Sequence, residues 1–217
     1  ENINFQLESG NVRCIIGPNG AGKTTFLSMI SGHQVPSAGR IIYKGQDITR
    51  LSVIERARLG IGRKFQTPTV FDNLTVRENV ELAVLRLKDN TRSAAMRIVE
   101  VLTAVRLDDR EIQRMLVKHL SHGQRQWLEI GLLLGNQSEL LLLDEPTAGM
   151  TSEETVATGR LIRRLAEERN LTVIIIEHDI NFIRDLKAPV TVLHLGKVLA
   201  EGSFDVVAAD STVRAVY

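Results

Sequence analysis

The stretch Gly17-Pro-Asn-Gly-Ala-Gly-Lys-Thr24 decides the fold of this 217-residue chain. It fits the pattern G-x-x-x-x-G-K-[ST] in full, and it lies between the apolar run Val12–Ile16 and a segment with helical apolar spacing. Glycines at three positions of the stretch let the backbone fold closely around a phosphate, with the N–H groups pointing inward. The strand, loop and helix together predict a phosphate-binding loop (P-loop) within an α/β core.

Two side chains of this loop carry chemistry. Lys23 brings a positive charge to the β- and γ-phosphates of a nucleotide, and the Thr24 hydroxyl can ligate Mg²⁺. A glycine-rich turn that matches by chance is the alternative, which the flanking strand and helix disfavour. The residues expected at the nucleotide are Gly17, Pro18, Asn19, Gly20, Ala21, Gly22, Lys23, Thr24 and Thr25.

Apolar runs alternate with helical patterns along the rest of the chain, which is typical of an α/β protein with a mainly parallel sheet. Strands buried on both faces are expected at Val12–Ile16, 140–143, Thr172–Ile176 and 190–195. The last of these is expected to begin a hairpin that turns near Gly196 and is followed by a short helix.

Two segments depart from this pattern. Residues 40–47 predict a small antiparallel β excursion, and residues 75–135 have helical apolar spacing that opens with a capping box at Thr75 and Glu78. We therefore expect one α/β P-loop NTPase domain over residues 1–217. Its core comprises 1–74 and 136–217 and includes the antiparallel part, and a helical subdomain is inserted at about 75–135.

Composition excludes several classes of protein. Lys and Arg number 27 against 26 Asp and Glu, without a long basic run, so a nucleic-acid partner is not expected. Cys14 is the only cysteine, which excludes an internal disulfide. The longest apolar stretches are far shorter than the roughly 20 residues that cross a bilayer, so any membrane spans must come from a partner.

The apolar run 140–143 ends in two acids, Asp144 and Glu145. The carboxyl end of a buried parallel strand meets the ligand crevice of an open α/β sheet. Asp144 is expected to hold Mg²⁺ through its water shell, and Glu145 to orient and polarise the attacking water. A solvated strand end leading into Pro146 is the alternative, and the P-loop in the same chain disfavours it.

A further motif separates this chain from the many other P-loop enzymes. Leu120-Ser-His-Gly-Gln124 resembles the LSGGQ signature of ABC ATPases, with His122 where that signature has glycine. Ser121 and Gln124 also fit a capping box for a helix over residues 127–134, and the two interpretations are compatible. A helix N-terminus with Ser121 and Gly123 exposed can bind phosphate. The resemblance implies that Ser121, Gly123 and Gln124 bind the γ-phosphate held by another subunit.

Three more matches follow the order of that family. Gln66 resembles the Q-loop glutamine, which senses Mg²⁺ and faces the transport partner, although it could be a polar residue at a strand end. His178 resembles the switch histidine that contacts the γ-phosphate, with a structural histidine as the alternative. Residues 148–151 occupy the place of the D-loop but depart from its common form, and Thr151 with Glu154 also reads as a capping box.

One family feature is absent. The aromatic residue that stacks on adenine lies farther upstream of the P-loop in the family than this chain extends. Phe5 falls in the first strand region, where a core position is expected instead. We expect that the natural protein has a short additional N-terminal segment.

The resemblance implies a function as well as a fold. An ATPase of this family works as a head-to-tail dimer of identical or different subunits, with ATP and Mg²⁺ as cofactors. It assembles with transmembrane permease subunits and, indirectly, a solute-binding protein, at the cytoplasmic face of the inner membrane. Catalytic roles are implied for Lys23, Gln66, Glu145 and His178, and Mg²⁺ ligation for Thr24, Gln66 and Asp144.

The cargo is suggested by finer similarities. Residues 60–71 and 121–131 resemble importers of the branched-chain amino acid and urea group. His122, Trp127 and Pro146-Thr-Ala-Gly-Met150 are most similar to the urea-importer ATPase. Urea is therefore the expected cargo, with branched-chain or other amino acids as the alternative, and all of these could be neutral differences within the superfamily.

Other classes remain as rivals. A P-loop kinase accounts for the loop at 17–24 but not for Ser121–Gln124 or His178. An ABC protein acting on nucleic acid or ribosomes usually has two cassettes or a long coiled-coil insertion. A non-enzymatic binding module is disfavoured because Lys23 and Glu145 are both present.

Overall fold

The computed structural model describes residues 3–65, 69–85 and 91–216. The strands of its main sheet are β1 (Val12–Ile16), β4 (Ile61–Lys64), β5 (Leu140–Asp144), β6 (Thr172–Ile176), β7 (Val190–His194) and β8 (Lys197–Gly202). Among these residues they form one six-stranded sheet in the order β4-β5-β6-β1-β7-β8. The strands are parallel except for β8, which pairs with β7 as an antiparallel hairpin. A separate antiparallel pair joins β2 (Ile42–Tyr43) to β3 (Gln46–Asp47).

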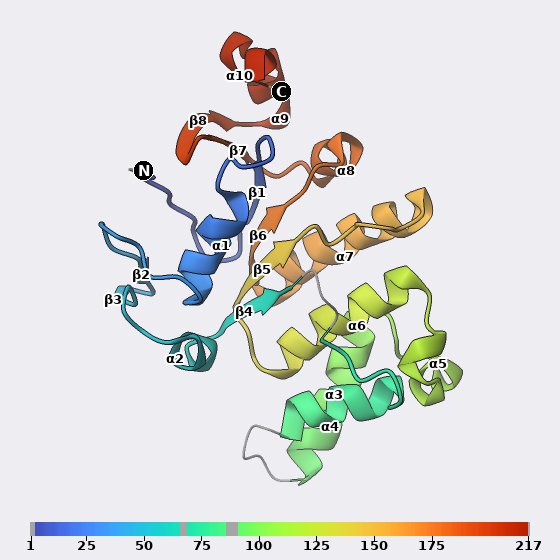
Figure 1. The fold of residues 1–217 in the computed structure, drawn as a ribbon. Helices are drawn as coiled ribbons and strands as arrows, with labels where there is room; N and C mark the ends of the chain where they lie inside the picture. The colour runs from blue at the N-terminus through green and yellow to red at the C-terminus, as the bar shows by residue number, and fades with distance from the viewer. Residues whose placement is uncertain (1–2, 66–68, 86–90, 217) are drawn as a thin grey trace.

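Helices cover both faces of the main sheet (Figure 1). Those beside the sheet are α1 (Lys23–Ser31), α2 (Val53–Arg58), α7 (Ser152–Arg169), α8 (Ile180–Leu186), α9 (Phe204–Ala209) and α10 (Ser211–Val216). The inserted helical part contains α3 (Val76–Leu85), α4 (Thr91–Ala104), α5 (Arg110–Arg114), the 3₁₀ helix η1 (Val117–His119) and α6 (His122–Gly135). No helix within the described ranges is both long and apolar enough to cross a membrane.

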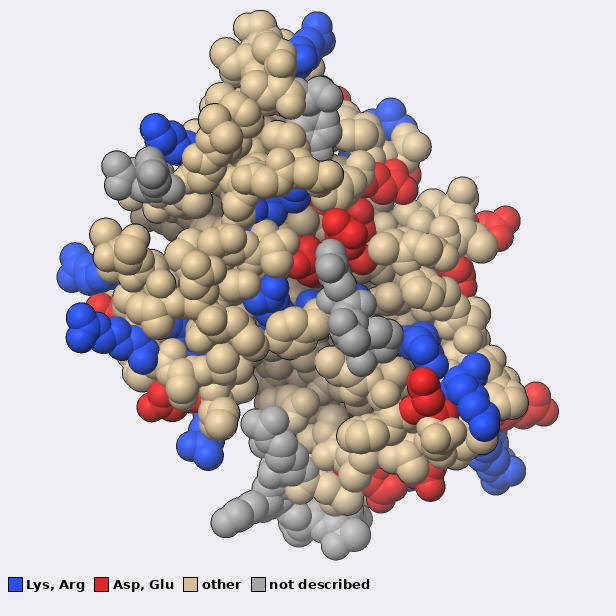
Figure 2. All heavy atoms as spheres, in the orientation of Figure 1, with Lys and Arg blue, Asp and Glu red and all other residues tan. Residues whose placement is uncertain are grey.

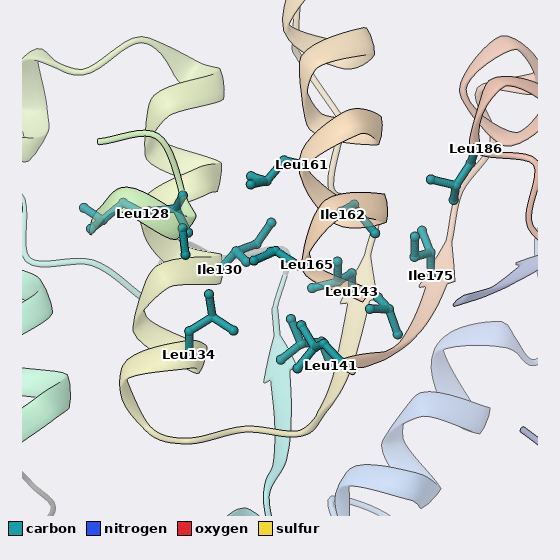
Figure 3. Close-up of a cluster of buried hydrophobic side chains, with 14 of the residues drawn as sticks. Leu128, Ile130, Leu134, Leu141, Leu143, Leu161, Ile162, Leu165, Ile175 and Leu186 are labelled. Atoms are coloured by element: carbon teal, nitrogen blue, oxygen red, sulfur yellow. The ribbon is translucent and has the colours of Figure 1, made fainter. Parts of the chain in front are cut away.

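Alternate residues of the buried strands pack into two separate hydrophobic clusters. One cluster joins α1 to the sheet face that carries Ile15, Leu142 and Ile174. The opposite face carries Leu141 and Leu143, which pack with residues of α6, α7 and α8 (Figure 3). The period-2 alternation of strand side chains thus gives each face its own helical layer.

The expected α/β architecture is confirmed. The four expected strands are present, with ends moved by one residue at Asp144 and His194, and the 40–47 excursion is the β2–β3 pair. The hairpin turn falls at Leu195 and Gly196, both with positive φ, and the single short helix expected after it is the pair α9 and α10. The capping box is also present, since the Glu78 backbone N–H donates to Thr75 Oγ1 and the Thr75 N–H donates to Glu78 Oε2.

Two local expectations were wrong or incomplete. Phe5 lies in irregular backbone rather than in a strand, although it does pack edge-on against Phe26, with ring centroids 5.2 Å apart. β4 was not among the expected strands, because its sequence Ile-Gly-Arg-Lys lacks an apolar run, although a strand end near Gln66 was one alternative. Its glycine permits close approach, since a Cβ at Gly62 would lie 2.4 Å from the Ser138 hydroxyl oxygen.

A buried ion pair connects β4 to α6. Lys64 Nζ lies 3.4 Å from a Glu129 carboxylate oxygen, and both side chains are 2% exposed. Burial raises the pKa of Glu129, and the neighbouring Lys64 charge opposes that shift. Each charge in the pair therefore depends on the other for its compensation.

We expect single and double substitutions of this pair to be strongly non-additive. Lys64→Met or Glu129→Leu alone leaves an uncompensated buried charge and should lower the free energy of unfolding by about 3–5 kcal/mol. The double variant removes both charges and should recover most of that loss. Urea-induced unfolding of all four proteins measures the coupling, and additive losses would contradict a paired role.

Candidate nucleotide site

The loop between β1 and α1 is shaped by glycine backbone conformations. Gly17 has φ 151°, and a Cβ there would lie 2.1 Å from the Leu193 carbonyl oxygen of β7. Gly22 is the N-cap of α1 with φ 98°, and it provides no side-chain oxygen to the first N–H groups of the helix. The loop therefore presents the positive end of α1 without a capping side chain, as a phosphate site requires.

The residues expected to bind the nucleotide differ in exposure. Four are exposed: Asn19, Gly20, Thr24 and Thr25. Gly17, Ala21 and Lys23 are buried. Lys23 Nζ donates hydrogen bonds to the carbonyl oxygens of Gly17, at 2.6 Å, and Pro18, at 3.1 Å. Burial lowers the pKa of Lys23, while the charges of Glu145 and Asp144 oppose the shift. The ammonium thus lies inside the loop and within the field of the two acids at the end of β5.

Asp144 is buried at the end of β5. Burial raises its pKa, and the Arg63 guanidinium, with Nη2 3.8 Å from the carboxylate, opposes the shift. The Thr24 hydroxyl also acts to lower the pKa of this carboxyl. Thr24 and Asp144 therefore bring two hard oxygen ligands together beside the phosphate loop.

These two ligands fit Mg²⁺. Within the described residues there is no cluster of three or more His, Cys, Asp or Glu that could hold a metal by itself. Mg²⁺ in phosphate-transfer sites typically takes one or two carboxylates plus substrate oxygens and water, so a dedicated cage is not needed. The third expected ligand, Gln66, lies outside the described residues.

Glu145 and His178 meet at the ends of neighbouring strands. A Glu145 carboxylate oxygen lies 3.3 Å from His178 Nε2, and both side chains are partly exposed. Glu145 has φ 48°, in the left-handed region that non-glycine residues rarely adopt. Its backbone N–H donates to the Ile176 carbonyl at 2.9 Å, so the turn after β5 is bonded to the end of β6.

Acidic side chains gather near the middle of one face of the molecule, around the ends of β5 and β6, with basic side chains close by (Figure 2). An apolar hollow of about 940 Å³ lies elsewhere, between α1 and the β2–β3 pair, and includes Phe5, Phe26 and Tyr43. None of the expected site residues that the structure describes borders that hollow. The candidate site is therefore the charged strand edge rather than this apolar space.

Sequence reasoning missed two buried charged residues at this edge, Arg63 and Glu177. Arg63 Nη1 donates to the hydroxyls of Ser28 and Ser31 on α1, so it links that helix to Asp144. Glu177 directly precedes His178 and is 4% exposed. The sequence signal for Glu177 is its position next to His178, whereas Arg63 lies three residues before Gln66.

The signature segment forms the start of α6. Ser121 is its N-cap, and Ser121 and Gln124 form the expected capping box, but the helix begins at His122 rather than near Trp127. The exposure expected for Gly123 was wrong, because this residue is buried. The Glu154 carboxylate covers it, and Glu154 Oε1 accepts hydrogen bonds from Ser121 Oγ at 2.8 Å and from the Gly123 N–H at 3.1 Å.

The segment 148–151 packs against this helix start. Gly149 has φ 77°, and a Cβ there would lie 3.3 Å from His122 Nε2. Thr151 is the N-cap of α7 and forms its expected capping box with Glu154. The Glu154 carboxylate therefore accepts hydrogen bonds at the N-termini of two helices, α7 and α6. Hydrogen bonds from Ser121, Thr151 and Gly123 lower its pKa.

The start of α6 and the phosphate loop are far apart within the chain. In Figure 1 the ends of β5 and β6 and the helix α7 lie between the α6 N-terminus and the loop that joins β1 to α1. Ser121, Gly123 and Gln124 thus form a group separate from the cluster of Lys23, Asp144, Glu145 and His178.

Known proteins resemble this chain in sequence. The sequence profile of the family described as ABC transporter matches residues 1–148. The chain is 32% identical over 232 residues to a probable branched-chain amino acid transport ATP-binding protein LivG of Archaeoglobus fulgidus, covering 99% of this chain and 87% of that relative. It is 31% identical to the high-affinity branched-chain amino acid transport ATP-binding protein LivG of Escherichia coli K12, covering 93% and 84%.

Solved structures share the fold over nearly the whole chain. cbiO1 of Clostridium perfringens, part of the ABC transporter complex cbiONQ, superposes with a TM-score of 0.88 at 27% identity, covering 99% of this chain and 86% of that one. The dimeric post-hydrolysis state of the ATP-binding cassette MJ0796, bound to ADP and Pi, gives 0.79 at 28% identity, covering 94% and 90%. The profile match, the relatives above 30% identity and the similarity to a cassette bound to ADP and Pi together show that this chain is an ATP-hydrolysing, ATP-binding domain that belongs to the ABC transporter family.

Proposed function

We propose that the chain is the ATPase subunit of an importer and that it works as a head-to-tail dimer. The observation that carries this proposal is that the two groups of site residues lie on different elements of one chain: one group at the start of α6, the other at the phosphate loop and the ends of β5 and β6 (Figure 1). In a head-to-tail pair, Ser121, Gly123 and Gln124 of each copy face the phosphate loop of the other. ATP then contacts both copies and favours the closed dimer, because it binds that state more tightly than the open one.

Each residue of the strand-edge cluster has a role in this arrangement. Bound Mg²⁺ supplies positive charge to the phosphate oxygens, and Thr24, Asp144 and Gln66 would hold it. Lys23 neutralises the β- and γ-phosphates. Glu145 orients the attacking water and accepts its proton, while His178 donates a hydrogen bond to the γ-phosphate.

The chain would act at the cytoplasmic face of the inner membrane, bound to transmembrane permease subunits. A solute-binding protein would deliver the cargo to those subunits. Urea is the proposed cargo, on the resemblance of His122, Trp127 and residues 146–150 to the urea-importer ATPase. Branched-chain amino acids are the second candidate, because the LivG relatives are branched-chain amino acid transport ATP-binding proteins.

These subgroup residues form one connected unit in the structure. Trp127 Nε1 donates to Thr158 Oγ1 at 2.9 Å, and Thr158 Oγ1 lies 3.3 Å from Met150 Sδ. His122 lies against Gly149 in the same region. The resemblance therefore reflects the packing of α6 against α7 and the loop before it, and the cargo has to be tested directly.

Replacing Glu145 by Gln should abolish turnover while ATP binding persists. The amide cannot accept the proton of the attacking water, so we expect phosphate release to fall at least about 100-fold. ATP-dependent dimerisation should strengthen because the bridging nucleotide is no longer cleaved. Glu153→Gln, at an exposed acid on α7, is the matched control. Near-normal release by Glu145→Gln would remove Glu145 as the base, and transfer of labelled phosphate to an acceptor instead of water would favour a kinase.

Glu154 should compete with ATP for the donors at the start of α6. Its carboxylate accepts from the Ser121 hydroxyl and the Gly123 N–H, which are the groups that would receive the γ-phosphate of the other copy. Glu154→Gln removes that negative charge but keeps an oxygen for the α7 cap. In a Glu145→Gln background we expect it to lower the ATP concentration for half-maximal dimerisation by about 2- to 5-fold, the scale of an exposed charge interaction.

Size-exclusion chromatography or light scattering across an ATP titration measures this shift. Glu153→Gln in the same background controls for the loss of one negative charge on α7. A higher ATP requirement would mean that Glu154 supports the α6 N-terminus rather than competing with ATP.

The cargo can be tested in the organism that encodes the chain. We expect deletion of the gene to abolish high-affinity uptake of labelled urea and growth on low urea as sole nitrogen source. Wild type, but not the Glu145→Gln variant, should restore both. Retained urea uptake together with lost uptake of labelled leucine would favour the second candidate.

A further inference from the structure

Glu177 is a buried carboxylate that the proposed mechanism does not use. It follows β6 directly, and both of its oxygens are engaged. Oε1 accepts hydrogen bonds from the Thr147 N–H, at 2.9 Å, and from the Thr147 hydroxyl. Oε2 accepts from the N–H groups of His178, at 2.8 Å, and Asp179, at 3.4 Å.

The groups that bind Glu177 belong to the two catalytic segments. Thr147 lies two residues after Glu145, in the turn that follows β5, and His178 is the residue next to Glu177. The same turn is also bonded to β6 through the Glu145 N–H and the Ile176 carbonyl, at 2.9 Å. The turn is therefore attached to the end of β6 at two points, one through backbone and one through the Glu177 side chain.

The conformation of Glu145 needs such support. Its φ of 48° is unfavourable for a residue with a side chain, and such conformations persist only where surrounding contacts fix them. One oxygen of the Glu177 carboxylate binds the turn through Thr147, and the other oxygen binds the backbone N–H of His178. Glu145 belongs to the first of these segments and His178 to the second, and a Glu145 carboxylate oxygen lies 3.3 Å from His178 Nε2.

We propose that Glu177 is a positioning residue for ATP hydrolysis, which sets the relative placement of the Glu145 carboxylate and the His178 ring. This inference rests on the proposed roles of Glu145 and His178. A carboxylate is needed because all of its partners are donors, so both oxygens must accept. A glutamine amide at 177 would turn one acceptor into a donor that faces an N–H group.

The test compares Glu177→Gln with wild type in the full chain, by measuring kcat, the Kd for ATP and the Tm. We expect kcat to fall by about 10- to 100-fold, since misplacement of a catalytic group by about 1 Å costs on that scale. The Kd for ATP should change by less than about 3-fold, because Glu177 contacts neither Lys23 nor Thr24 in the described structure. Glu201→Gln is the matched control, since its carboxylate also accepts from a threonine hydroxyl, Thr191, but lies on β8.

Unchanged kcat in Glu177→Gln would overturn the proposal. So would parallel losses of kcat, ATP affinity and Tm that match those of Glu201→Gln, because these would indicate a general structural role. If Glu177→Gln does not fold, Thr147→Val and Thr147→Ser decide the question. Loss of kcat in the valine variant with rescue by serine supports the proposal, and equal activity in both overturns it.

Glu145→Gln and His178→Ala, measured alongside, separate this inference from the proposed function. If either of them retains full hydrolysis, the proposed catalytic roles fail. If both lose activity while Glu177→Gln keeps it, only the role of Glu177 fails.

Discussion

The parallel pairing of β4, β5, β6 and β1 is the constraint on which the site depends. Its register aligns Ile15 with Ile176 and Ile176 with Asp144, so the ends of three strands lie side by side. Parallel strands all finish at one edge, and that edge receives the P-loop, the acid pair and His178. A slip of one residue in β5 would turn Asp144 toward the opposite face of the sheet. The hydrogen-bonded ladder therefore fixes the chemistry as well as the fold.

Buried charges then connect this edge to the surrounding helices. Adjacent residues of β4 point to opposite faces, so Arg63 reaches Asp144 and the serines of α1, while Lys64 reaches Glu129 on α6. Glu177 connects the turn after β5 to the end of β6. Burying each charge is unfavourable on its own, and each is accompanied by opposite charges or donors from other elements. These contacts connect α1, the acid pair and α6 to one another.

A second set of contacts connects α6 to α7. Glu154, Trp127 and Gly149 bring together the signature helix and the segment that follows the acid pair. The turn after Glu145 therefore runs directly into the segment that packs on the start of α6.

The sequence by itself determined the features that depend on neighbouring residues. The P-loop glycines, the apolar strands and the capping boxes at Thr75, Ser121 and Thr151 follow from local conformational preferences, and the structure agrees with each. The tertiary structure decided what depends on partners far away in the chain. β4 carries two charges that can be buried only because Asp144 and Glu129 meet them, and Gly123 is covered by a carboxylate 31 residues later. Glu177 likewise depends on the turn after β5, which supplies hydrogen-bond donors to its carboxylate. A buried charge is unfavourable unless such partners surround it, and the sequence around Glu177 does not show them.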